Sequence, residues 1–139
     1  MNAALSRFLL VATALGAAHE VADHWVQTHD QASTKGAPGA AGRRACAAHV
    51  ATYTATGAAA VLLASRRLGL RLAPASLAAG LALNAVTHYA ADRRAPLHRL
   101  AVALGKAGYL EQPTGPFHLD QSWHYGWIFL SALLAAGRC

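Results

Sequence analysis

Charged side chains are scarce in this sequence. They make up 13% of the 139 residues, while 55% are hydrophobic; soluble domains carry about 25% charged residues. Acidic residues are the rarest of them, with six Asp and Glu against twelve Lys and Arg. A shortage of charge together with a surplus of apolar side chains is typical of a protein whose surface faces lipid. The composition therefore predicts an integral, multi-pass protein of the cell membrane, with membrane lipid as a partner.

Other features that the sequence lacks argue against further classes of fold and function. No segment alternates between apolar and polar residues with period two, which argues against strands. The two cysteines, Cys46 and Cys139, are not in a Cys-x2-Cys spacing, which argues against a zinc knuckle. Basic residues occur in short groups between apolar segments, without interleaved aromatics. This pattern argues against nucleic acid as a partner and suits loops that lie against anionic headgroups.

Four apolar segments are each near the ~20 residues that cross a hydrocarbon core. They run from about Ala3 to Gln27, Arg44 to Ser65, Pro74 to Asp92 and Leu119 to Ala136. We expect an all-α fold, a four-helix transmembrane bundle that forms a single domain over 1–139. Cys46 and Cys139 would then lie at opposite faces, about 30 Å apart. An alternative for the first segment is a signal peptide that is removed after Ala18.

Three connections join these segments. Residues 28–43 contain Lys35–Gly36 and Pro38–Gly39 and are expected to form an irregular loop. The connection 66–73 is short and basic, which predicts that the second and third helices form a tight antiparallel pair. Residues 93–118 carry apolar side chains at helical spacing, namely Leu97, Leu100, Ala101 and Leu104. This spacing predicts a short amphipathic interfacial helix between the third and fourth helices, with a solvated loop as the alternative.

Polar residues form one stripe on each expected helix. Residues four apart share a helix face. The stripes are His19 with Asp23, His49 with Tyr53, Asn84 with His88 and Asp92, and Asp120 with His124. Because successive spans are antiparallel, all four stripes should lie at the same membrane face.

Four imidazoles and three carboxylates at one face are a plausible ligand set for a transition metal. The predicted metal ligands are His19, Asp23, His49, His88, Asp92, Asp120 and His124. One or two divalent ions (Zn, Mn or Fe) would suit them, and two such ions commonly serve hydrolysis. One of Asp23, Asp92 or Asp120 could instead act as the catalytic base. Gln27, Tyr53 and Asn84 are expected to orient the ligands. The alternative is that each His–Asp pair only satisfies buried polarity.

The order and spacing of these residues resemble a family of uncharacterised bacterial integral membrane proteins. The resemblance spans nearly the whole chain and rests on His19-x3-Asp23-x3-Gln27-Thr28, Lys35-Gly36, His49-x3-Tyr53, His88-x3-Asp92-Arg93-Arg94 and Asp120-Gln121-x2-His124. The family brings no established activity. More distantly, His and Asp stripes on membrane helices are similar to those of membrane-bound metal-dependent hydrolases.

These observations favour a membrane-bound metal-dependent hydrolase acting on a small phosphoester, such as a lipid headgroup or a nucleotide. Two alternatives remain open: a metal- or proton-binding membrane protein or transporter component, and a structural or partner-binding bundle. Seven Lys and Arg residues fall on the side of the polar stripes and five on the other. This difference slightly favours a cytoplasmic face for the polar site.

Overall fold

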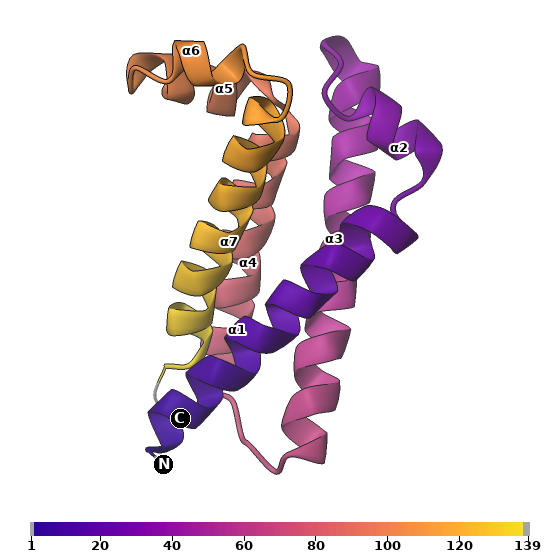
Figure 1. The fold of residues 1–139 in the computed structure, drawn as a ribbon. Coiled ribbons are helices and arrows are strands. Elements are labelled where there is room, and N and C mark those ends of the chain that lie inside the picture. Colours follow the sequence, from indigo (N-terminus) through magenta and orange to yellow (C-terminus); the bar gives the residue numbers. More distant parts are fainter. Residues whose placement is uncertain (1, 138–139) are drawn as a thin grey trace.

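A computed structural model describes residues 2–137, and within them the chain is all-helical and contains no strand. The long helices are α1 (Ala3–Val21), α3 (Gly39–Arg67), α4 (Pro74–Asp92) and α7 (Gly115–Ala135). In Figure 1, α4 and α7 lie side by side, and α1 crosses in front of α3 at an angle. The all-α prediction is confirmed. Cys139 falls outside the described residues, so its expected position relative to Cys46 stays a prediction.

The segment 28–43 contains helices where an irregular loop was predicted, so that prediction is wrong. Helix α2 (His29–Thr34) begins with a capping box, in which the Thr28 side chain accepts from the Gln31 N–H and the Gln31 side chain accepts from the Thr28 N–H. This reciprocal pairing satisfies two N–H groups and stabilises a helix too short to persist alone. Helix α3 then begins at Gly39, five residues before Arg44.

Residues 93–118 form two short helices, α5 (Ala95–Ala103) and α6 (Ala107–Leu110), which lie across one end of the bundle (Figure 1). Helix α5 confirms the predicted short helix in this connection. Its Ala101 is buried and Leu97 is half-buried, while Leu100 is exposed. Helix α7 begins at Gly115, four residues earlier than expected, because Pro116 occupies its first turn.

The apolar core occupies the end of the bundle away from α5 and α6. It is made of side chains from α1, α3 and α7: Leu10, Val11, Leu15, Val61, Ile128, Ala132 and Ala135. Because α1 supplies three of these, removing it as a signal peptide would open the core. Helices α4 and α7 approach closely at Gly80, where an added Cβ would lie 2.6 Å from the Ser131 carbonyl oxygen.

Two helices among the described residues are long and apolar enough to cross a membrane, Ala3–Val26 and Gly39–Arg67. Only 28% of each span is buried inside the protein, which is less than a core helix of a soluble protein would bury. The surface carries many large apolar side chains, including Leu63, Val86 and Phe129. Four spans are not confirmed, because polar stripe residues such as Asn84 and His88 lower the mean hydropathy of the later helices.

Candidate metal centre

The last turn of the first helix is widened. Residues Ala22–Val26 (η1) form a π-helical turn, in which the Gln27 N–H donates to the Ala22 carbonyl at 2.9 Å. Such turns insert an extra residue and occur often at functional sites. The turn leaves Asp23 half-buried and Trp25 86% exposed. The helix ends at Val26, one residue before the predicted end, and Gln27 continues in an extended conformation.

Asp23, His49 and His88 bring three ligand atoms together from η1, α3 and α4. Asp23 Oδ1 lies 3.2 Å from His49 Nε2 and 3.6 Å from His88 Nε2, and the two ring nitrogens are 3.0 Å apart. Ligand atoms about 2.0–2.1 Å from a tetrahedral zinc ion lie about 3.3–3.4 Å from one another. The three separations therefore fit the spacing of ligands around one metal ion.

Asp92 approaches the same ring nitrogens and is also paired with a lysine. Its Oδ2 lies 3.3 Å from His49 Nε2 and 3.1 Å from His88 Nε2. Its Oδ1 lies 2.7 Å from Lys35 Nζ, and the two side chains are 4% and 13% exposed. Asp92 Oδ2 is therefore as close to both ring nitrogens as Asp23 Oδ1 is, although the ligand group of Asp23, His49 and His88, whose atoms lie within 4.8 Å of one another, does not include it. Asp92 thus borders this group and carries a buried ion pair.

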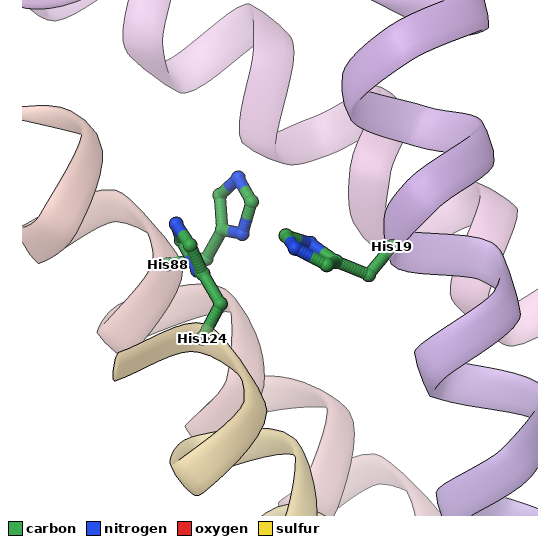
Figure 2. Close-up of side chains that lie close together, drawn as sticks. All are labelled: His19, His88 and His124. Atoms are coloured by element: carbon green, nitrogen blue, oxygen red, sulfur yellow. The ribbon is translucent and has the colours of Figure 1, made fainter. Parts of the chain in front are cut away.

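A second group of ligand atoms is formed by His19, His88 and His124, again within 4.8 Å of one another. Figure 2 shows the three imidazole side chains converging from α1, α4 and α7. Their ring centroids lie 4.9 Å apart for His19 and His124, and 4.3 Å apart for His88 and His124. All three side chains are buried. His88 belongs to both groups and therefore connects them.

Hydrogen bonds on the far sides of two rings orient them. His19 Nε2 lies 3.2 Å from Gln121 Oε1, and an N–H there leaves the lone pair on Nδ1. The Gln27 amide nitrogen Nε2 lies 3.0 Å from His49 Nδ1 and donates to it, so the proton of His49 is on Nε2, which faces Asp23. Rotating the Gln27 amide by half a turn would place its oxygen on Nδ1 and free the Nε2 lone pair for a metal. Residues behind metal-binding histidines commonly fix the tautomer in this way.

Tyr53 and Asn84 support the ring of His88. The Tyr53 ring stacks on His88 with centroids 3.7 Å apart. Asn84 Nδ2 donates to the Tyr53 hydroxyl at 3.0 Å, and both side chains are buried. A stacked ring held by a hydrogen bond restricts the orientation of His88, as expected for residues that orient a ligand.

Several buried polar atoms of this cluster make no well-aligned hydrogen bond among residues 2–137. They are His19 Nδ1, Asp23 Oδ1, His88 Nδ1, Asp92 Oδ2 and His124 Nε2. The two carboxylate oxygens lie 3.1–3.6 Å from ring nitrogens of His49 and His88, which satisfies them in part. Leaving such an atom unsatisfied costs about 1–3 kcal/mol. In addition, the ionised Asp23 and Asp92 carry two negative charges against one on Lys35. A bound cation would satisfy both the lone pairs and the excess negative charge, so these residues fit a metal.

Among the predicted site residues, Asp120 lies at the edge of the His/Asp cluster. Its Oδ2 is 3.5 Å from His124 Nε2, its side chain is 34% exposed, and it belongs to neither ligand group. The structure brings the other predicted residues, His19, Asp23, His49, His88, Asp92 and His124, into one cluster. The four histidines outside the polar stripes, namely His24, His29, His98 and His118, are exposed.

Lys35 and Gln121 are partners of the cluster that sequence reasoning did not assign. Both occur in the motifs of the family resemblance, and that was their only signal. Arg93 fixes the Lys35 segment by donating to the carbonyls of Lys35 at 2.5 Å and Ala37 at 2.8 Å. This segment packs so closely that a Cβ on Gly42 would overlap the Ala37 carbonyl.

No family model, curated protein or solved structure matches this chain. The resemblance to uncharacterised bacterial membrane proteins therefore stays a prediction, and the site is interpreted from its own geometry.

Proposed function

We propose that the chain is a four-span membrane protein with the His/Asp cluster near one membrane face. Two helices meet the length and hydropathy of a span, and α4 and α7, at 19 and 21 residues, are long enough to cross with them. Exposed Trp25 and half-exposed Trp127 suit the headgroup level or the lipid face. The polar-site face is assigned to the cytoplasm on the balance of basic residues.

The cluster is proposed to bind one or two divalent transition-metal ions. The single observation that carries this proposal is the 3.0–3.6 Å spacing of Asp23 Oδ1, His49 Nε2 and His88 Nε2. These three residues would hold one ion. His19 and His124, together with His88, could hold an ion instead; for both groups to be filled at once, His88 would have to lose its second ring proton and bridge the two ions. Imidazole and carboxylate ligands suit Zn, Mn and Fe.

The reaction we propose is hydrolysis of a phosphoester. A divalent ion supplies an activated water and stabilises charge on a phosphoryl oxygen. Asp92 reaches both the cluster and an adjoining pocket, and its buried Oδ2 lies 3.3 Å from His49 Nε2 and 3.1 Å from His88 Nε2. It is therefore positioned to accept the proton of an attacking water. The water oxygen bonds to phosphorus, the ester P–O bond breaks, and the alcohol leaves with a proton.

A non-enzymatic metal-binding role is the second candidate. It is favoured by the burial of His49 and His88, which are 0% and 1% exposed and leave little room for a substrate beside them. Both candidates require metal, and only the first requires turnover.

The test is metal content followed by activity. Purified protein should carry roughly one or two transition-metal ions, the range usual for hydrolytic sites. Asp23→Asn and His88→Ala should lose metal, whereas His98→Ala, which removes an exposed imidazole outside both groups, should not. Metal-loaded protein should then hydrolyse bis(p-nitrophenyl) phosphate, and Asp92→Asn with full metal content should not. Full metal content without turnover of any phosphodiester would select the non-enzymatic role.

A further inference from the structure

A pocket of about 430 Å³ lies beside the cluster, between the C-terminal end of α4, helix α5 and the start of α7. Its polar lining comes from Lys35, Asp92, Arg94, His98 and Asp120. Asp92 also touches His49 and His88, so the pocket and the cluster share a wall. A molecule in this pocket would lie directly beside the proposed metal centre.

Only some of the charged side chains that line the pocket are available to a ligand. Lys35 and Asp92 pair with each other at 2.7 Å and neutralise one another. This pairing leaves the guanidinium of Arg94 and the carboxylate of Asp120, which is 34% exposed. Arg94 has a φ of 58°, and its side chain lies against Gly36, where a Cβ would be 2.7 Å from Arg94 Cδ. The pocket therefore offers one cation and one anion, which complement a zwitterion.

An apolar groove continues from this pocket. A second cavity of about 410 Å³ shares Leu97, Ala101 and Leu119 with the first and extends between α5 and α7. Beyond the shared residues it is lined mainly by apolar groups, including Leu100, Trp123, Trp127 and Leu130. Gly126 leaves part of it open, because a Cβ there would meet nothing within 4 Å. A polar pocket continuous with an apolar groove has the shape of a lipid site, with a headgroup end and an acyl-chain end.

We infer that this site binds a phospholipid with a primary amine in its headgroup. Arg94 contacts the phosphate, Asp120 accepts hydrogen bonds from the ammonium, and one acyl chain lies in the groove between α5 and α7. A lipid bound in this way would have its phosphoester beside Asp92. That the lipid is also the substrate rests on the proposed hydrolase function. The inference also gives Asp120 a role in recognition, consistent with its position outside both ligand groups.

The three tryptophans allow a direct binding test. Trp25→Phe leaves Trp123 and Trp127, both in the groove, as the only tryptophans. Phosphatidylethanolamine with brominated acyl chains, titrated into this variant in detergent, should quench their fluorescence with an affinity at least about fivefold higher than brominated phosphatidylglycerol. The ion pair between the partly exposed Asp120 carboxylate and the headgroup ammonium, which phosphatidylglycerol lacks, is worth about 1 kcal/mol, or roughly fivefold. Equal affinity for the two lipids would overturn the inference.

Matched variants separate the parts of the site. Asp120→Asn should reduce phosphatidylethanolamine binding to the phosphatidylglycerol level. Gly126→Leu fills the groove and should weaken both lipids about fivefold or more, while Gly108→Leu, also in open space, should change neither. Likewise, Arg94→Gln should weaken the binding of both lipids, whereas Arg99→Gln should change the binding of neither. Unchanged binding in Asp120→Asn, or full competition by soluble glycerophosphoethanolamine, would contradict the assignment.

Metal content measured on the same samples distinguishes this inference from the proposed function. Asp120→Asn should keep its metal while losing lipid selectivity. Metal-loaded protein without lipid selectivity would refute the lipid site alone. Selective lipid binding by protein that takes up no metal would refute the metal centre alone.

Discussion

Removing the buried ammonium of Lys35 should strongly destabilise the metal-free protein. Lys35 Nζ lies 2.7 Å from Asp92 Oδ1, and the two side chains are 13% and 4% exposed. Breaking such a buried pair by deleting one partner costs about 3–5 kcal/mol, because the other charge stays buried without compensation. We therefore expect Lys35→Met to lower the free energy of unfolding by about that amount, whereas an exposed pair would contribute about 0–1 kcal/mol.

The assay is equilibrium unfolding in mixed micelles, followed by helical circular dichroism. Lys106→Met is the matched control, because Lys106 is the other lysine of the chain and is exposed. The double variant Lys35→Met with Asp92→Asn removes both charges and should recover part of the lost stability. Zinc at a hundredfold excess over its dissociation constant should restore about 2.7 kcal/mol to Lys35→Met. A loss below about 1 kcal/mol in metal-free Lys35→Met would refute the buried-pair reasoning.

Three further predictions concern packing, topology and pH. Gly42→Ala should destabilise the protein, because its Cβ would overlap the Ala37 carbonyl, while Gly126→Ala should be neutral or stabilise it by up to about 1 kcal/mol; thermal unfolding of both variants compares them. Cysteines placed at positions 36 and 69 in a cysteine-free background should be labelled from opposite sides of the membrane, and labelling from one side would exclude four spans. Metal affinity should fall as acid protonates the histidine ligands, because imidazole binds metal only when neutral; titration with a fluorescent zinc chelator measures this, and an affinity independent of pH from about 8 down to about 4 would argue against histidine ligands.

The helical periodicity of the sequence was sufficient to predict much of the cluster. His19 with Asp23, and His88 with Asp92, are four residues apart, and a regular helix places such residues on one face. Antiparallel order then brings His49 and His124 to the same end of the bundle. These predictions needed only the local helix geometry and the alternation of chain direction. Neither depends on the exact residue at which a helix begins or ends.

Features that depend on contacts between distant segments could not be predicted in this way. Lys35 pairs with Asp92 in a segment that Arg93 holds by donating to the carbonyls of Lys35 and Ala37. Nothing in the local pattern around Lys35 specifies that contact. The π-helical turn at Ala22–Val26 also has no signature in the apolar periodicity, although it sets the position of Asp23. Asp120 follows the same four-residue rule as the other pairs, yet the structure leaves it at the edge of the site.

Zinc X-ray absorption on protein incubated with one equivalent of zinc tests the central claim most directly. The account predicts a first shell of nitrogen and oxygen atoms at about 2.0–2.1 Å with imidazole scattering behind it. Asp23→Asn or His88→Ala should abolish this spectrum, and His98→Ala should leave it unchanged. A sulfur shell at about 2.3 Å, which would place zinc at a cysteine such as buried Cys46, or folded protein that retains no zinc, would contradict a metal centre formed by Asp23, His49 and His88.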